Sequence, residues 1–253
     1  MTAFSHWSFR GFVMNRRLIT LLAVATMSGA CDKKVVGPTG VDATQPFGRL
    51  RVVNAVSDAT IADRVNVLVE GAPFAVSLAL GGAAPAAPVL YFPVYEGSRQ
   101  ISVRRTADTS VHVLDGTFQI AANTDQTIFV VKQGGAVVSL LVPDDNTPPS
   151  TGEVKLRVIH LAQSAGNVDI YVTAPNASIA ALAPSFANVA PGTVSAYLPR
   201  LAGAAQVRFT APGSKTPILT VTTPAIPAGA IRTVLSLDPQ TGIALAGATL
   251  TDR

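Results

Sequence analysis

The chain repeats itself after Phe47, and this internal repeat constrains the fold more than any other feature. The segment "GRLRVVNAVSDATIADRVNVLVEG" (48–71) opens the first half, and "VKLRVIHLAQSAGNVDIYVTA" (154–174) opens the second. Later segments recur in the same order at a spacing of about 105 residues, as "LYFP" (90–93) and "AYLP" (196–199) do. A period of this length predicts two tandem domains rather than a solenoid of short repeats.

Within each half the segments are short, and apolar residues alternate with polar ones. The three valines of "VNVLVEG" (65–71) fall on one face, as do Ile101 and Val103 in "RQISVRR" (99–105). Such alternation is typical of half-buried strands, because successive side chains point to opposite faces. Gly134-Gly135 predicts a tight hairpin, since glycine tolerates positive φ. Several short strands in about 100 residues predict an all-β fold of two tandem antiparallel β-sandwiches.

The N-terminal segment has the parts of a secretory signal. The apolar run "LITLLAVATM" (18–27) follows Arg16 and Arg17, and it is too short for a membrane span of about 20 residues. Small residues then lead to cleavage after Ala30, and Cys31 is the only cysteine of the chain. This arrangement resembles a bacterial lipobox, in which the thiol is acylated, although Ser28 stands where leucine is usual. The alternative is a plain signal peptide with an incidental cysteine.

These features predict the division of the chain. We expect a signal peptide with a short helix at 1–30, with Met14 as an alternative start, a lipid-anchored flexible tether at 31–47, a first β-sandwich at 48–143, a linker at 144–153 and a second β-sandwich at 154–253. Acylated Cys31 would bind membrane lipid and place the protein in the bacterial cell envelope, facing the periplasm or the cell surface. Without acylation the protein would be secreted.

The charge of the chain gives no support to nucleic-acid binding. The formal net charge is +4, but Arg10, Arg16 and Arg17 all precede Cys31, where there is no acidic residue. Removal of the signal leaves 16 basic against 15 acidic residues. Recognition of nucleic acid needs a clustered basic face, which this balance does not indicate.

The residues do not form a catalytic motif. A Ser164-His160-Asp169 set could be drawn, but a nucleophile elbow such as Gly-x-Ser-x-Gly is missing from the sequence. The simpler interpretation is that His160 ends a strand and hydrogen-bonds nearby backbone. A polysaccharide hydrolase would need two carboxylates facing each other across a cleft. The candidates in the first half are Asp58, Asp63, Glu70, Asp108 and Asp115.

Metal and ligand sites are equally sparse. Asp144-Asp145-Asn146 could contribute to a calcium site but is more typical of a solvated linker, so we expect no metal and no cofactor. Tyr91 and Tyr197 are equivalent in the repeat, which indicates a structural role. Tyr95 has no aromatic counterpart and is the candidate for ligand contact.

The opening of the second half resembles a known family. Members of the bacterial domain-of-unknown-function family 4397 tend to begin with Leu-Arg-Val-x-His-Ala, followed by a Val-Asp-Val-Tyr-Val strand. The matching residues here are Leu156, Arg157, Val158, His160, Val168, Asp169, Ile170 and Tyr171. The first half is more distant, with Asn54 in place of His160. The resemblance implies immunoglobulin-like sandwiches on secreted or surface-anchored bacterial proteins, often in tandem, and implies no activity.

Two hypotheses about function follow. The first is a non-enzymatic, lipid-anchored cell-envelope protein that acts as a binding, adhesion or spacer module, with an envelope protein or a glycan as partner. The second is an accessory or cryptic envelope polysaccharide hydrolase. The lack of a catalytic motif favours the first.

Overall fold

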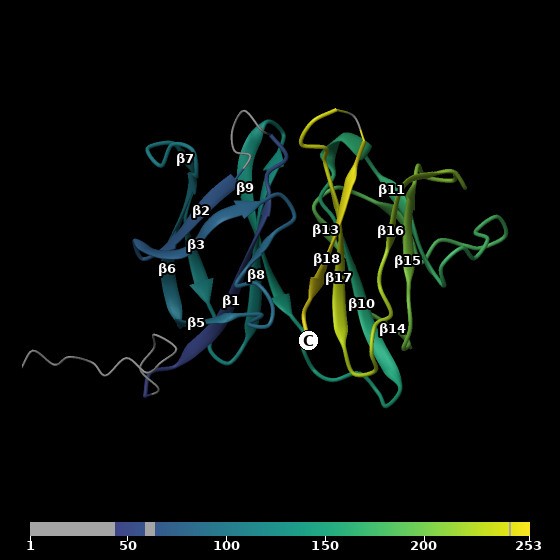
Figure 1. Ribbon diagram of the computed structural model, residues 1–253, viewed down its shortest axis with the longest axis horizontal. Helices are drawn as coiled ribbons and strands as arrows, with labels where there is room; N and C mark the ends of the chain where they lie inside the picture. Colours follow the sequence, from purple (N-terminus) through teal and green to yellow (C-terminus); the bar gives the residue numbers. More distant parts are fainter. Residues whose placement is uncertain (1–43, 59–63, 243) are drawn as a thin grey trace, which may run out of the picture. The chain divides into compact units, whose positions relative to one another are not determined.

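The computed structural model describes residues 44–58, 64–242 and 244–253. Their regular secondary structure is almost entirely strand, and the strands form two sandwich-like units, which confirms the predicted all-β class (Figure 1). A 3-10 turn, η1 (Gln163–Ala165), is the helical element of the described part. Within that part, no helix has the length and apolar character to cross a membrane. The predicted signal helix, Ala30 and Cys31 lie outside the described residues.

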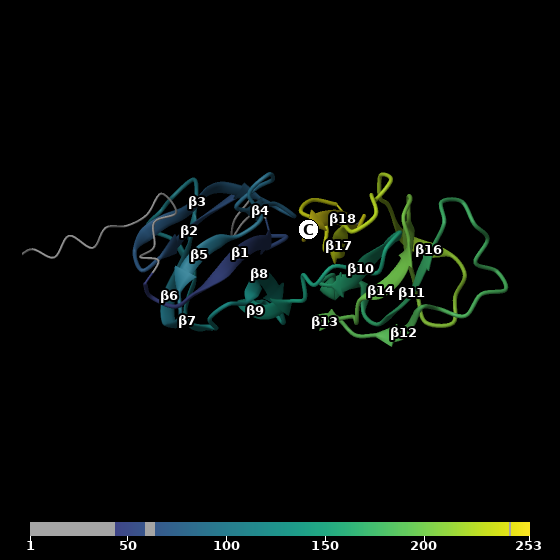
Figure 2. The same cartoon turned by 90° about the horizontal axis from the view of Figure 1, so that it is seen from below.

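The first sandwich consists of nine strands in two sheets. One sheet has the order β3-β2-β6-β7, and the other has the order β4-β1-β8-β9 with β5 also paired to β1 (Figure 2). The strands are β1 (Phe47–Ala55), β2 (Arg64–Val69), β3 (Ala72–Ala79), β4 (Ala83–Ala84), β5 (Phe92–Tyr95), β6 (Gly97–Arg105), β7 (His112–Ile120), β8 (Asp125–Gln133) and β9 (Ala136–Asp144).

The second sandwich repeats this pairing scheme. Its sheets have the orders β12-β11-β15-β16 and β13-β10-β17-β18, with β14 also paired to β10 (Figure 2). The strands are β10 (Glu153–His160), β11 (Val168–Thr173), β12 (Phe186–Val189), β13 (Thr193–Val194), β14 (Leu198–Leu201), β15 (Gln206–Thr210), β16 (Pro217–Thr222), β17 (Ile231–Leu237) and β18 (Ala246–Thr251).

One strand pair in each sandwich departs from the antiparallel prediction. β1 pairs with β8 in parallel, with Val52 opposite Ile128, and β10 pairs with β17 in parallel, with Val158 opposite Val234. A parallel pair needs a long crossover connection. Here the crossover contains the strands of the opposite sheet together with two short strands of the same sheet, β4 and β5 in the first sandwich and β13 and β14 in the second.

Each sandwich encloses its own apolar core. The alternation predicted from the sequence is confirmed, since Val65, Val67, Ile101 and Val103 are all fully buried. The core of the first sandwich contains Leu50, Val52, Val56, Val65, Val67, Val94, Ile101, Val103, Phe118, Ile120, Ile128 and Val130. The core of the second contains Val154, Leu156, Val158, Val168, Ile170, Ala205, Val207, Phe209, Val221, Ile226, Ala230 and Val234.

A third apolar cluster joins the outer faces of the two central sheets. Its buried members are Val53, Ala55, Phe129, Val131 and Val142 from the first sandwich, and Ile159, Leu161, Leu235, Leu237 and Leu250 from the second. The strands β1, β8, β10 and β17 are therefore buried on both faces. Parallel strands covered on both sides are expected to be continuously apolar, which explains the run Ile128–Val131.

The hairpin predicted at Gly134-Gly135 is confirmed. Gln133 pairs with Ala136, and the two glycines between them have φ of +57° and +86°. Two consecutive residues with positive φ form a turn whose twist matches that of the flanking strands.

Substitution of Phe129 tests the third cluster. Phe129→Ala is expected to lower the free energy of unfolding by about 3–5 kcal/mol, because the cavity opens in packed interior. Val76→Ala removes a side chain that is 72% exposed and is expected to change it by less than about 0.5 kcal/mol. Urea denaturation measures both, and similar losses would contradict burial of Phe129 between the sheets.

Candidate functional site

Two arginines lie buried among the apolar residues of the third cluster. Arg51 on β1 and Arg157 on β10 each have a side chain only 1% exposed. Both point to the outer face of their sheet, because their neighbours Leu50 and Leu156 point into the sandwich cores. A buried guanidinium is stable only when carboxylates and other acceptors surround it.

Each arginine forms an ion pair with an aspartate from the other sandwich. Arg51 Nη2 lies 2.6 Å from Asp252 Oδ1, and Arg157 Nη2 lies 2.6 Å from Asp144 Oδ1. Arg51 Nη2 also lies 3.4 Å from Asp144 Oδ2. Both carboxylates are fully buried. The two arginines and two aspartates form the crossed ion cluster, which carries no formal net charge.

Two threonines connect the members of the crossed ion cluster. Thr127 Oγ1 accepts from Arg51 Nε at 2.9 Å and donates to Asp144 Oδ2 at 2.5 Å. Thr233 Oγ1 stands in the same relation to Arg157 Nε, at 3.1 Å, and to Asp252 Oδ2, at 2.6 Å. Because a hydroxyl both accepts and donates, each threonine satisfies a cation and an anion together.

Backbone carbonyls take a further donor from each arginine. Arg51 Nη1 donates to the carbonyl of Thr251 at 2.8 Å, and Arg157 Nη1 donates to the carbonyl of Pro143 at 3.3 Å. Each carbonyl belongs to the other sandwich and precedes the aspartate that pairs with the same arginine. The two arginines therefore share three kinds of acceptor, and Arg51 has Asp144 as an additional one.

Tyrosine rings cover both arginines, which agrees with the structural role predicted for Tyr91 and Tyr197. The guanidinium carbon of Arg51 lies 4.7 Å from the ring centre of Tyr91, and that of Arg157 lies 4.7 Å from the ring centre of Tyr197. These are cation–π distances. The Tyr91 hydroxyl also donates to Asp144 Oδ2 at 2.9 Å.

In the crossed ion cluster, burial shifts the pKa of a charged group in one direction, and the neighbouring opposite charges shift it in the other. Burial raises the pKa of Asp252, and the adjacent charges of Arg51 and Arg157 oppose that shift. Burial alone would lower the pKa of Arg51, but the carboxylate of Asp252 and its neighbours reverse this and raise it. Burial also raises the pKa of Tyr91, so that its hydroxyl remains a donor.

The structure corrects the interpretation of Asp144 as part of a solvated linker. Asp144 ends β9, and its buried carboxylate is held by Arg157, whereas Asp145 binds Lys155 at 2.7 Å. That partner, with Thr147, lowers the pKa of Asp145 to about 2. Among the described residues, no group of three or more His, Cys, Asp or Glu could hold a metal ion.

The crossed ion cluster was not predicted from the sequence, although the sequence contains a signal for it. An arginine stands between apolar residues at equivalent positions of both halves, in Leu50–Val52 and Leu156–Val158. The aspartates follow similar strands, in "LVPD" (141–144) and "TLTD" (249–252). A charge at the same place in two buried strands predicts a buried partner, since an unpaired charge there is very costly.

The residues of the imagined triad have separate partners. His160 is buried at the end of β10, with Nδ1 2.7 Å from Ser236 Oγ and Nε2 2.8 Å from the carbonyl of Gly166. Ser164 Oγ donates instead to Asp238 at 2.5 Å. Asp169 accepts from the backbone of Asn188 and Gly213. The simpler interpretation of His160, as a strand end bonded to nearby backbone, is confirmed.

The candidate carboxylates of the hydrolase hypothesis are also engaged separately. Asp58 pairs with Lys132 and Asp115 with His112, Glu70 accepts from the backbone of Gln100, and Asp108 accepts from Ser110. Asp63 lies outside the described residues. None of the four described carboxylates is hydrogen-bonded to another.

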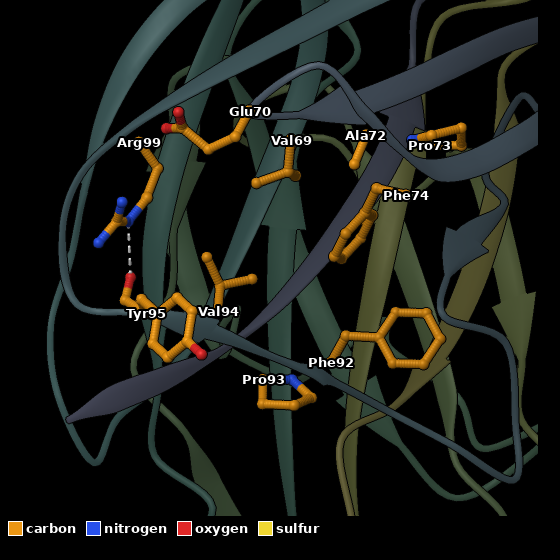
Figure 3. Close-up of a pocket in the computed structure, with 10 residues that line it drawn as sticks. All are labelled: Val69, Glu70, Ala72, Pro73, Phe74, Phe92, Pro93, Val94, Tyr95 and Arg99. Atoms are coloured by element: carbon orange, nitrogen blue, oxygen red, sulfur yellow. Dashed lines mark hydrogen bonds between the residues drawn. The ribbon is translucent and has the colours of Figure 1, made fainter. Parts of the chain in front are cut away.

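Tyr95 lines an open groove of about 440 Å³ between β3 and β5 of the first sandwich (Figure 3). Most of its lining is apolar: Val69, Ala72, Pro73, Phe74, Phe92, Pro93 and Val94. Phe74 and Phe92 pack edge to face with ring centres 5.5 Å apart, and Phe92 remains 40% exposed. The groove therefore offers an aromatic surface to solvent.

The two charged side chains of the groove are bonded to backbone. They lie at the end away from the phenylalanines (Figure 3). Arg99 donates to the carbonyls of Tyr95, at 3.0 Å, and Glu96, at 2.6 Å, and Glu70 accepts from the amide of Gln100 at 2.7 Å. These contacts hold the groove end in place and leave contact with a ligand mainly to apolar groups.

The edge of β5 is closed to an added strand. Glu96 donates to the carbonyl of Pro46, so the alternate residues Val94 and Phe92 turn their backbone groups toward β1. Pro93 and Tyr95 face outward, where proline has no amide hydrogen and the Tyr95 carbonyl already accepts from Arg99. A partner would have to bind through side chains here.

The second sandwich differs at the corresponding place. The pairing of β14 with β10 corresponds to that of β5 with β1. It places Arg200 at the position of Val94, and Leu201 at the position of Tyr95. Arg200 is half-buried and donates to the carbonyl of Thr173 at 3.4 Å. An aromatic groove is thus a feature of the first sandwich at this position.

Removal of one arginine from the crossed ion cluster tests its burial. Arg51→Met is expected to lower the free energy of unfolding by about 3–5 kcal/mol, because Asp252 is left buried without its partner. The control Arg49→Met removes an arginine two residues away that pairs with Asp125 but is 57% exposed, and should cost less than about 1 kcal/mol. Equal costs in urea denaturation would show that Arg51 is solvated.

His160 gives a pH dependence of defined sign. Burial lowers its pKa below 6.5, so the unfolded chain takes up a proton before the folded chain does. Stability should therefore be full above pH 6.5 and fall below it, by at most about 1.4 kcal/mol at pH 5.5. His160→Asn, which copies Asn54 of the first sandwich, should remove this slope between pH 7.5 and 5.5. An unchanged slope would exclude His160 as its source.

Two solved structures show distant similarity to this chain. The Bacillus anthracis TIE protein shares 10% identity at a TM-score of 0.24, over 81% of this chain and 44% of that one. A protein from Bacteroides eggerthii, described as a candidate cell adhesion protein, shares 10% identity at a TM-score of 0.20, over 82% of this chain and 96% of that one. Similarity at this level carries no inference about this chain.

Comparison with sequences is more informative. No curated protein matches the chain. Residues 48–171 match the model of a family described as Domain of unknown function (DUF4397), a region that spans the first sandwich, the linker and the first two strands of the second. The match supports the family resemblance seen in the sequence, and residues 48–171 of this chain are similar to the DUF4397 family.

Proposed function

We propose that this chain is a non-enzymatic, lipid-anchored protein of the bacterial cell envelope that binds a partner protein through the groove of the first sandwich. The observation that carries the proposal is the aromatic lining of that groove. Phe92 is large, apolar and 40% exposed beside Phe74, and Tyr95 lines the other end of the same groove (Figure 3). Exposed aromatic clusters of this kind are typical of binding surfaces.

The chemistry of the groove favours apolar side chains of a protein segment over a glycan. A sugar needs several polar partners for its hydroxyl groups. Here Arg99 and Glu70 already bond to backbone, and the remaining lining is mainly hydrocarbon. An apolar or aromatic side chain that stacks against Phe92 would gain contact area without leaving hydroxyl groups unpaired.

The position of the groove fits a membrane-anchored protein. Tyr95 pairs with Phe47, the first residue of β1, so the groove opens beside the point where the proposed tether joins the sandwich. The 16 residues from Cys31 to Pro46 reach at most about 55 Å when fully extended. A partner in the groove would therefore be held close to the membrane.

We also propose that the two sandwiches are tandem copies of one domain. Residues 76 positions apart pair in parallel in both, as Arg51 does with Thr127 and Arg157 with Thr233. The order of strands in the sheets is the same. The second copy would act as support and spacer, since its equivalent of the groove has Arg200 in place of Val94.

Photo-crosslinking in living cells tests the groove. A photoreactive amino acid at position 92 should capture a protein, and the adduct should fall at least tenfold when Tyr95→Ser is added. The same probe at Leu201, which is 77% exposed at the position equivalent to Tyr95, should capture no such protein. Equal capture at both positions would contradict a specific groove, and a captured glycan would replace the protein partner.

Lipid labelling tests the anchor separately. The wild type should incorporate labelled fatty acid and sediment with membranes, and Cys31→Ala should lose both properties. A wild type that takes no label and is recovered outside the cell would contradict the anchor and leave a secreted binding protein.

A further inference from the structure

The surface between the two sandwiches uses equivalent residues on both sides. Strand register identifies the equivalents: Arg51 and Arg157 pair with Thr127 and Thr233, which in turn pair with Val142 and Leu250. Two residues beyond these lie Asp144 and Asp252. In the crossed ion cluster, Arg51 binds the second sandwich's aspartate and Arg157 binds the first's. The arginine–aspartate pairs are therefore exchanged in both directions. The tyrosine hydroxyls differ, since that of Tyr91 donates to Asp144 and that of Tyr197 has no hydrogen-bond partner among the described residues.

The apolar residues of the interface also occupy equivalent positions in the two sandwiches. Each of the five buried residues from the first sandwich has an apolar equivalent among the five from the second. The pairs are Val53 and Ile159, Ala55 and Leu161, Phe129 and Leu235, Val131 and Leu237, and Val142 and Leu250. The match extends over the whole buried patch rather than over the charged residues alone.

An interface in which residue i contacts j while j contacts i is isologous, and an isologous patch is complementary to itself. We infer that the outer face of the central sheet is a homotypic pairing surface, whose partner is a second sandwich of the same design. That sandwich comes from the same chain in the structure described, and a second copy of the chain carries the same surface.

The buried charges favour a partner sandwich that carries an arginine and an aspartate at the same positions. A sandwich that covers the face must place an aspartate against Arg51 and an arginine against Asp144 while excluding water. A merely apolar partner would remove the 2.6 Å ion pairs that Arg51 and Asp144 each make across the interface. It would leave them buried with only their mutual contact at 3.4 Å, which is unfavourable. The pairing surface therefore selects for sandwiches that carry the same arginine and aspartate at the same positions.

The length of the linker determines whether the pairing surface binds the sandwich of the same chain or that of another chain. Eight residues, 145–152, connect the end of β9 to the start of β10. So short a connection keeps the second sandwich at a high effective concentration beside the first. Pairing within the chain therefore prevails, and homotypic pairing between chains should be seen once the connection is cut.

Cleavage of the folded protein is the test. A recognition sequence for a site-specific protease is inserted between Pro149 and Ser150, and the folded full chain is cut. Native mass spectrometry then measures the complexes of the N-terminal and C-terminal fragments. Self-complementary faces predict three species after equilibration: the mixed pair, a pair of two N-terminal fragments, and a pair of two C-terminal fragments.

Two matched variants make the assignment specific. Asp252→Asn removes one ion pair from the mixed species, two from the C-terminal pair and none from the N-terminal pair. Each lost pair should weaken association about a hundredfold. Asp144→Asn should give the mirror pattern and spare the C-terminal pair. Asp108→Asn changes an exposed carboxylate bonded to Ser110 and should change none of the three.

The outcomes are distinct. Three species with mirrored losses in the two variants would support the inference. The mixed pair could be the one species seen, at fragment concentrations up to 100 times its dissociation constant. Each surface would then bind only the sandwich from the other half of the chain, which would overturn homotypic pairing. Fragments that separate while each keeps its β-sheet circular dichroism would overturn the pairing surface itself. None of these outcomes depends on the groove or on the lipid anchor.

Discussion

The crossed exchange of two buried arginines is the interaction on which the rest of this structure depends. A guanidinium placed between apolar residues must find a carboxylate, and here each carboxylate comes from the other sandwich. The exchange ties the end of β9 to β10 and the end of β18 to β1. Because charge and hydrogen bonding must both be satisfied, the contact is far more selective than apolar packing alone would be.

The exchange also explains the unusual burial of the central strands. β1 and β8 have a sandwich core on one face and the third apolar cluster on the other, and β10 and β17 repeat this arrangement. β1 links the cluster to the groove as well, since Arg51 lies in the cluster while Phe47 pairs with Tyr95. The proposed binding surface is thus built on the same strand that the second sandwich holds in place.

Much of the fold could be predicted from local patterns, since alternation at Val65, Val67, Ile101 and Val103 reports a buried face directly. The parallel pairing of β1 with β8 could not, because local periodicity does not say which distant strand lies alongside. Asp144 was misplaced in the linker for a similar reason: a carboxylate beside Asp145 and Asn146 looks solvated until its partner, 13 residues ahead, is known. Tyr95, predicted as a ligand contact, lines the groove, and its contact with a ligand stays a prediction. Phe74 and Phe92 were not predicted, because their contact joins two sheets.

The central claim is that the buried interface between the two sandwiches makes them unfold together, although each has its own core. Differential scanning calorimetry of the intact chain tests this most directly. The account predicts a single thermal transition with an enthalpy that corresponds to unfolding of both sandwiches. The calorimetric and van't Hoff enthalpies of that transition should be equal. Two separable transitions, each with the enthalpy of about 100 residues, would contradict it and reduce the crossed ion cluster to a contact between independent domains.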